Sequence, residues 1–356
     1  MSGGAITINP RDAQLMYCTL LFSVFARISG LLLALVLMAC GPSTRDPLRV
    51  ATLPWPGYET LHLAQSLEYL NEPDIRLVEL VNTSQIASAL RNGTVAAATI
   101  TLDSALTLIH EGVDLNVVLV MDYSLGADAV IARPAITTLQ HIRGKRIAVE
   151  NATVGGVMLD ALLTEAALSV TDIQLVSMTV NEHLAAYRRG EVDVVVTFEP
   201  VSTVLLDEGG LRLYDSRAIP GRVLDVLVVR KELMNRYRPQ LQALLKAHFR
   251  ALDYLQQSPD DAYARIAPYL GVSAEQVATM MAGIRVPSLG DNHRLLNGSR
   301  PELVRVAGEL ADFMVQRQLL RRAPAVDHLV QPDFLPPSNF FTSQFLTSQP
   351  AGQVQP

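Results

Sequence analysis

Cysteine is almost absent from this chain of 356 residues, which contains only Cys18 and Cys40. If a leader that includes Cys18 is removed, as argued below, the remaining cysteine can form neither an internal disulfide nor a cysteine-based metal site. The seven histidines show no metal-ligand spacing, and no Gly-x-Ser-x-Gly turn or phosphate-binding loop occurs. The sequence therefore predicts no metal, no cofactor and no enzymatic activity.

Basic residues are also fewer than acidic ones. The chain carries 29 Lys and Arg against 35 Asp and Glu, a formal net charge of −6, and its basic residues are scattered. Nucleic-acid binders need a basic stripe or patch, so a nucleic-acid partner is excluded. The composition, 49% hydrophobic and 18% charged, is that of a folded protein, and 356 residues exceed what one hydrophobic core usually supports. We therefore expect two lobes.

The apolar run near the N-terminus is too short for a membrane-spanning helix. Residues 29–39 (SGLLLALVLMA) fall short of the roughly 20 residues that such a helix needs, but match a signal-peptide core preceded by Arg11 and Arg27. The run ends in residues 37–41 (LMACG), which resemble a bacterial lipobox with a small residue before the cysteine. Cys40 is then the acylated, palmitate-bearing N-terminus of the mature protein.

These features predict a signal peptide at 1–39 and a short tether at 40–47. They indicate a lipoprotein held on the periplasmic side of the cell envelope, in the inner or the outer membrane. The alternative is a signal anchor that stays uncleaved, with Cys40 as a buried thiol. The start codon is also open, because initiation at Met16 would give a more compact signal.

An internal repeat with an offset of 97 or 98 residues indicates the architecture. Each copy contains a β-rich run, a helical pattern, a second strand, a helix closed by glycine, and a third strand that leads into another helix. Strands that alternate with helices in this way predict parallel sheets with right-handed crossovers. The matching segments are 49–53 with 146–150, 74–78 with 172–176, and 89–112 with 186–209.

We therefore expect an α/β protein of two lobes, each a mainly parallel sheet flanked by helices, joined by a hinge of two segments. The long helical patterns after the second copy must pack somewhere, and the first lobe is the economical place. The protein is expected to be a monomer. The expected boundaries are 48–127 with 231–325 for lobe 1, 134–222 for lobe 2, 128–133 with 223–230 for the hinge, and 326–356 for an extended or disordered tail.

Several short motifs resemble the type II periplasmic solute-binding proteins, within them the nitrate, sulfonate and thiamine-pyrimidine-precursor (NMT1/THI5-like) group. The motifs are 54–59 (PWPGYE), 92–95 (NGTV), 122–128 (DYSLGAD), 142–147 (IRGKRI) and 196–200 (VTFEP), and the resemblance covers about residues 47–320. It implies the two-lobed fold of these proteins, ligand capture between the lobes, and delivery to a permease of the ABC type.

The cleft is expected at the carboxyl ends of the strands, where ligands sit in open α/β sheets. Trp55, the only tryptophan, could form an aromatic wall there or plug the space under its loop. Gly155 and Gly156 open a helix whose backbone N–H groups could receive an oxyanion, or they form only a tight turn. The predicted ligand-binding residues are Trp55, Tyr58, Asp103, Ser104, Tyr123, Ser124, Asp128, Glu150, Thr153, Gly155, Gly156, Phe198 and Glu199.

The acidic residues favour a cationic or amino-bearing ligand. Asp122, Asp128, Glu150 and Glu199 give the cleft negative charge without matching Lys or Arg, so an amine would pair better here than nitrate or a sulfonate. Asp103 and Glu199 have an alternative role as helix caps or first-turn acids.

Two other functions are open at this point. Thiamine-pyrimidine synthases of the same group use a cysteine cluster and a histidine, and the scarcity of cysteine excludes that chemistry here. The closed form could instead be read by a membrane sensor protein in place of a permease. Neighbouring genes for a permease and an ATPase, or for a signalling protein, would separate these two.

Overall fold

The computed structural model describes residues 46–70, 74–150 and 154–340. The predicted signal peptide, Cys40 and Thr153 lie outside these residues. Among the described residues, no helix is both long and apolar enough to cross a membrane. The described residues from Pro47 onward belong to one compact unit.

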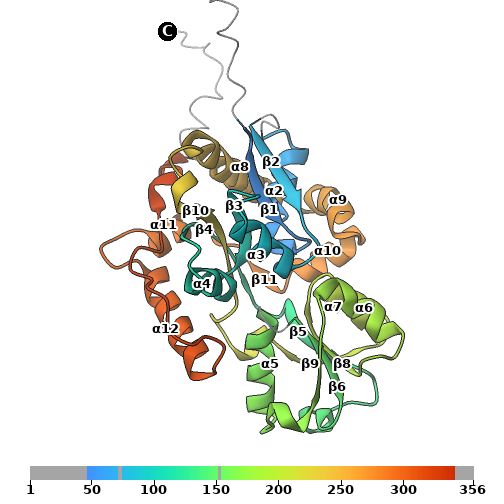
Figure 1. Cartoon of the computed structure of the whole chain (residues 1–356). Coiled ribbons are helices and arrows are strands. Elements are labelled where there is room, and N and C mark those ends of the chain that lie inside the picture. The colour runs from blue at the N-terminus through green and yellow to red at the C-terminus, as the bar shows by residue number, and fades with distance from the viewer. Residues whose placement is uncertain (1–45, 71–73, 151–153, 341–356) are drawn as a thin grey trace, which may run out of the picture. The chain divides into compact units, whose positions relative to one another are not determined.

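Lobe 1 is built on a six-stranded sheet with the order β11-β4-β10-β3-β1-β2 (Figure 1). Its strands are β1 (Leu48–Thr52), β2 (Ile75–Glu79), β3 (Ala97–Thr101), β4 (Leu115–Ser124), β10 (Leu224–Arg230) and β11 (Ile284–Arg285). Its helices are η1 (Pro56–Tyr58), α2 (Thr60–Ser66), α3 (Thr83–Arg91), α4 (Leu102–His110), η5 (Lys231–Leu233), α8 (Arg238–Gln257), α9 (Pro259–Leu270), α10 (Ala274–Met281), α11 (Leu289–Leu296), α12 (Glu302–Gln316) and η6 (Pro332–Phe334).

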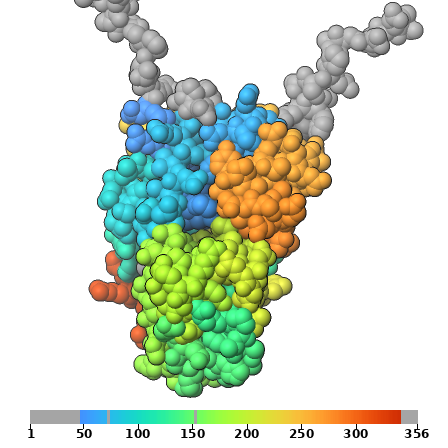
Figure 2. Space-filling view, turned by 90° about the vertical axis from the view of Figure 1, so that its right-hand side faces the viewer, coloured from blue at the N-terminus to red at the C-terminus, as the bar shows by residue number. Residues whose placement is uncertain are grey.

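Lobe 2 is built on a five-stranded sheet with the order β7-β6-β8-β5-β9. Its strands are β5 (Asp128–Ala132), β6 (Arg146–Val149), β7 (Gln174–Ser177), β8 (Val194–Phe198) and β9 (Leu211–Asp215). Its helices are η2 (Leu139–Ile142), α5 (Val154–Glu165), η3 (Val170–Asp172), α6 (Val180–Arg188), α7 (Val201–Asp207) and η4 (Ser216–Ala218). Figure 2 shows lobe 2, in green and yellow-green, directly against the blue and orange atoms of lobe 1.

Strand pairing confirms the internal repeat. In lobe 1, Val50 pairs with Ala97 in the parallel ladder between β1 and β3. In lobe 2, Ile147 pairs with Val194 between β6 and β8. Each residue of the second pair lies 97 positions after its counterpart in the first, so the two copies share their register as well as their element order.

Alternating side chains explain why lobe 2 carries helices on both faces of its sheet. Val130 and Ala132 of β5 pack with α5 in one apolar cluster, and Ala129 and Ile131 pack with α6 and α7 in another. Successive residues of a strand point to opposite faces, so a strand with apolar side chains on both faces, such as residues 129–132, needs cover on both sides. Figure 1 shows α5 on one side of this sheet and α6 and α7 on the other.

Two expectations need correction. Both sheets are mixed, because β10 runs antiparallel to β3 and β4, and β5 runs antiparallel to β8 and β9. The segments 128–133 and 223–230, expected as the hinge, therefore belong largely to β5 and β10. A strand with hydrogen-bonded neighbours on both sides is held in its sheet. The segments that connect the two sheets are 125–127, between β4 and β5, and 216–223, between β9 and β10.

The first part of the predicted tail packs on lobe 1. Leu329 and Phe334 are 2% and 1% exposed. Val117 of β4 donates its backbone N–H to Leu329 at 2.7 Å and accepts from Gln331 at 2.8 Å. Residues 326–340, expected to be extended or disordered, are thus docked on lobe 1 and include the short helix η6, while 341–356 lie outside the described residues.

Candidate functional site: an acidic and aromatic cavity between the lobes

A small cavity lies between the two lobes, at the edge where the repeated strands end. β10 and β5 run antiparallel to β3 and β8, so they begin at this edge and contribute Asp225, the second residue of β10, and Asp128, the first residue of β5. The free volume is about 20 Å³, room for about one water molecule, so a solute can enter only when the walls move apart. The lining residues are Leu53, Trp55, Tyr58, Thr83, Ile100, Thr101, Asp128, Val154, Phe198 and Asp225.

The aromatic side of the cavity is set by the turn after β1. Trp55 precedes the short helix η1, and Trp55 and Tyr58 are each 3% exposed. The ring of Trp55 meets that of Phe198 from lobe 2 edge to face, with centroids 5.7 Å apart and planes at 84°. Such contacts contribute about 0.5–1.5 kcal/mol beyond area burial. This pair therefore links the lobes across the cavity.

Gly57 permits the close packing of this turn. A Cβ atom at this position would lie 1.9 Å from Oδ2 of Asp122 and 2.7 Å from Nε1 of Trp55. Only glycine lets the backbone come so near a buried carboxyl group.

Two carboxyl groups face each other behind the aromatic turn. Asp122 on β4 and Asp225 on β10 are cross-strand partners, and they are 0% and 1% exposed. Trp55 Nε1 donates to Asp122 Oδ2 at 3.1 Å, and the Tyr58 hydroxyl donates to Asp225 Oδ1 at 3.0 Å. Burial raises the pKa of Asp122 to about 7. Burial, followed by the charge of Asp122, raises the pKa of Asp225 well above its usual range. The pair therefore retains a proton at neutral pH.

Two further acids surround this pair. Burial, followed by the charge of Asp225, raises the pKa of Asp128 well above its usual range. Burial raises the pKa of Asp103, in the first turn of α4, to about 6. Asp122 and Asp225 share a side-chain hydrogen bond, whereas Asp128 Oδ2, among the described residues, is buried and has no hydrogen-bond partner. Of the ten described residues that line the cavity, none is Lys, Arg or His.

Glu150 joins the lobes rather than lining the cavity. Its Oε1 accepts from the backbone N–H of Ser84 at 3.0 Å and from the Ser84 hydroxyl at 2.5 Å, at the start of α3 in lobe 1. Its Oε2 accepts from Val180 N–H at 3.2 Å, at the start of α6 in lobe 2. Beside it, the Asn82 side chain donates to Asn181 at 2.9 Å. Both helix N-termini favour negative charge, so this carboxylate stabilises the closed arrangement.

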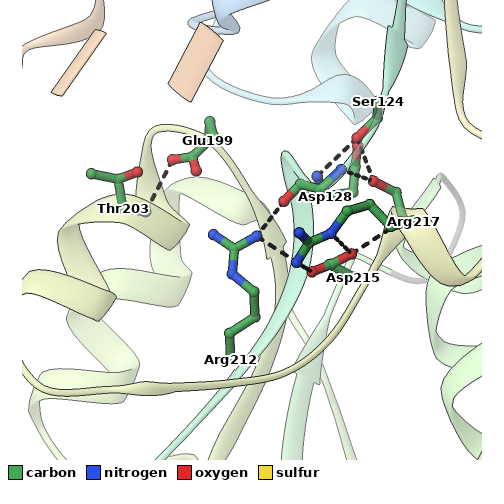
Figure 3. Close-up of polar contacts among 9 residues, drawn as sticks. Ser124, Asp128, Glu199, Thr203, Arg212, Asp215 and Arg217 are labelled. Carbon is green, nitrogen blue, oxygen red and sulfur yellow. Dashed lines mark hydrogen bonds and ion pairs between the residues drawn. The ribbon is translucent and has the colours of Figure 1, made fainter. Parts of the chain in front are cut away.

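Ser124 and Glu199 lie toward the crossovers between the lobes (Figure 3). Ser124 Oγ accepts from the Asp128 N–H at 3.0 Å and lies 2.8 Å from the Ser216 hydroxyl, tying the two crossovers together. Glu199 Oε2 accepts from the backbone N–H of Thr203 at 3.0 Å. This is the helix-capping alternative for Glu199, and its side chain lines a separate groove on this side.

The structure thus brings together only part of the predicted set. Trp55, Tyr58, Asp128 and Phe198 line the cavity, as do six residues outside the predicted set: Leu53, Thr83, Ile100, Thr101, Val154 and Asp225. The predicted residues that do not line it are Asp103, Ser104, Tyr123, Ser124, Glu150, Gly155, Gly156 and Glu199.

Several of these residues have structural roles. Tyr123 packs under the guanidinium of Arg285, 4.3 Å from its ring centroid. Ser104 accepts a hydrogen bond from Thr101 at 2.8 Å. Gly155 allows α5 to approach the chain, since a Cβ there would lie 2.7 Å from the carbonyl oxygen of Glu150.

Asp225 is the most important residue that sequence reasoning missed. It is the single charge in an otherwise apolar run, 223–229 (VLDVLVV), which was assigned to the hinge. An isolated carboxylate inside a buried strand is costly and is a signal for a functional group, and it could have identified this residue.

Comparison with known proteins agrees with the geometry. The sequence profile of the NMT1-like family matches residues 41–270. The chain belongs to the NMT1-like family. This confirms the resemblance seen in the sequence motifs.

Individual relatives of this NMT1-like protein are more distant. The taurine-binding periplasmic protein of Escherichia coli K12 is 24% identical over 180 residues, which are 50% of this chain and 56% of that protein. The chain thus aligns with little more than half the length of this curated relative.

Among the described residues, no group of three or more His, Cys, Asp or Glu could hold a metal ion.

Solved structures share the fold at low sequence identity. The alkanesulfonate-binding protein from Xanthomonas axonopodis pv. citri, bound to MOPS, has a TM-score of 0.68 at 19% identity and covers 80% of this chain and 98% of its own. The ligand-binding component of an ABC-type import system from Staphylococcus aureus has a TM-score of 0.68 at 16% identity, covering 82% and 98%. The two-lobed periplasmic-binding-protein fold expected from the sequence is confirmed.

Proposed function

We propose that this chain is a solute-binding protein that captures a small, amine-bearing cation between its lobes and delivers it to an ABC-type permease. The observation that carries this proposal is the charge of the cavity. Asp128 and Asp225 line it, Asp122 is the cross-strand partner of Asp225, and no lining Lys or Arg among the described residues offsets them. A buried carboxylate needs a partner, and a ligand cation supplies one.

Delivery to a permease and the place in the cell rest on the family. Membership in the NMT1-like family and the fold shared with a component of an ABC-type import system support transport. We propose a monomer on the periplasmic side of the envelope, anchored by a lipid on Cys40. In this proposal the chain binds its solute and performs no chemistry on it.

A zwitterionic aminosulfonate is the second candidate ligand. The curated relative is named as a taurine-binding protein, and taurine carries an ammonium as well as a sulfonate. Its ammonium would meet the acidic cluster, and its sulfonate would meet the N-terminus of α5, whose first described residue, Val154, lines the cavity.

Calorimetric titration of the purified protein tests these proposals. We expect ethanolamine or guanidinium to bind and methanesulfonate and nitrate not to bind, because the latter bring negative charge without an amine. Taurine binding more tightly than ethanolamine would favour the zwitterion. Methanesulfonate or nitrate as the best ligand would refute the cationic site.

An uptake assay tests the link to a permease. Cells that lack this chain should lose uptake of the labelled solute and regain it when the chain is restored. Unchanged uptake in cells that lack it would favour the sensor alternative.

A further inference from the structure

One buried acceptor atom in the acidic cluster limits the chemistry of the cation further. Asp128 Oδ2, in a residue that lines the cavity, has no partner among the described residues. Asp128 is 3% exposed, so bulk water does not satisfy this atom. A buried acceptor left unpaired costs about as much as a lost hydrogen bond, and such atoms are rare in folded proteins.

The other acceptors of the cluster are already in use. Asp122 Oδ2 accepts from Trp55, and Asp225 Oδ1 accepts from Tyr58. Asp122 and Asp225 also share a side-chain hydrogen bond, through the proton that the pair retains. The buried acceptor left to a ligand is therefore Asp128 Oδ2.

Asp128 begins β5 of lobe 2, and Tyr58 and Asp225 of lobe 1 line the same cavity. A ligand that donates a hydrogen bond to Asp128 Oδ2 while it fills the cavity would contact both lobes and stabilise closure. A ligand without donors would leave that atom unpaired and would have to rely on the aromatic rings.

Those rings are already engaged with other groups. Trp55 and Phe198 contact each other edge to face. The polar edges of Trp55 and Tyr58 are directed at Asp122 and Asp225. An aromatic cage for an alkylated ammonium needs ring faces turned toward one cation, and this arrangement uses the rings to hold the carboxyl groups instead.

We infer that the solute of this cavity is a cation that donates at least one N–H hydrogen bond to Asp128 Oδ2, as a primary ammonium, amidinium or guanidinium group does, and is not a fully alkylated ammonium. This inference rests on the proposed function, since it presumes that the cavity takes a cation. It adds that N–H groups, rather than charge alone, determine which cations bind.

A methylation series tests the inference on the unaltered protein. Ethanolamine, its N-methyl and N,N-dimethyl derivatives, and choline keep one positive charge while losing N–H groups one at a time. We expect choline, which has no N–H group, to bind at least about tenfold more weakly than ethanolamine, since the one charged hydrogen bond that it cannot make is worth tenfold or more. The fluorescence of Trp55, the only tryptophan, gives a second readout at the site.

Variants separate hydrogen bonding from charge. In Asp128→Asn, the ratio of ethanolamine to choline affinity should fall toward one, because an acceptor that distinguishes them has been altered. Glu199→Gln is the matched control, since Glu199 caps α7 and does not line the cavity; its ratio should stay at the wild-type value.

The outcomes distinguish the two proposals. Choline bound as tightly as ethanolamine, or more tightly, would overturn the inference and leave the cationic site standing. Binding of methanesulfonate with no response to any of the four amines would overturn both.

Discussion

Replacing Asp122 with asparagine should stabilise the empty protein at neutral pH. The buried carboxyl has a pKa of about 7, against 3.8 for an ordinary aspartate. The folded state therefore holds a proton that the unfolded state has lost at any pH between these values. Stability then falls as pH rises through this window, since the folded state binds more protons than the unfolded state. Three units of pKa shift correspond to about 4 kcal/mol.

Asparagine removes this penalty and keeps the local geometry. Its oxygen can still accept from Trp55, and its amide can donate to Asp225. The free energy of unfolding of Asp122→Asn minus that of wild type should increase from pH 4 to about pH 7 and level off above it. The total change should be on the order of 4 kcal/mol.

The difference between the two proteins is the quantity to measure, because other groups titrate as well. Burial lowers the pKa of His183 to about 4 and that of His248 to about 3, so both stabilise the fold as pH rises toward 6.5. These contributions are common to both proteins and cancel. Urea unfolding from pH 4 to 9, without ligand, gives the values. A difference that does not change with pH would refute the assignment of a raised pKa to Asp122.

Three other perturbations test separate parts of the structure. Gly57→Ala should displace the Asp122 carboxyl, alter Trp55 fluorescence and cost about 1–3 kcal/mol of stability. Gly290→Ala is the control, because a Cβ atom there meets nothing nearer than 3.8 Å. Equal effects of the two substitutions would contradict the reasoning. Glu150→Gln should weaken the link between α3 and α6 by about 1–3 kcal/mol and enlarge the ligand-free radius of gyration in X-ray scattering. Glu182→Gln, which alters only the cap of α6, should leave that radius at the wild-type value. Cys40→Ser should abolish the lipid adduct detected by mass spectrometry, and a wild-type protein without an adduct would disprove the anchor.

The sequence by itself determined the architecture. The repeat at an offset of 97 predicted two copies of one α/β unit, and the copies pair their strands in the same register. Repetition is visible in sequence because each copy must satisfy the same local periodicity and the same turns. The motif at 54–59 likewise located the aromatic wall, since prolines and a glycine fix the turn that carries Trp55.

Only the tertiary structure decided the sheet assignment and the composition of the site. Nothing local in 128–132 or 224–230 distinguishes a strand within a sheet from an extended crossover, because the difference lies in the neighbours that hydrogen-bond to it. The same holds for the acids. Glu150 and Glu199 each directly follow a strand of lobe 2, yet one bridges two helix N-termini and the other caps a helix. A carboxylate's role depends on which donors surround it, and those donors come from segments far apart in the chain.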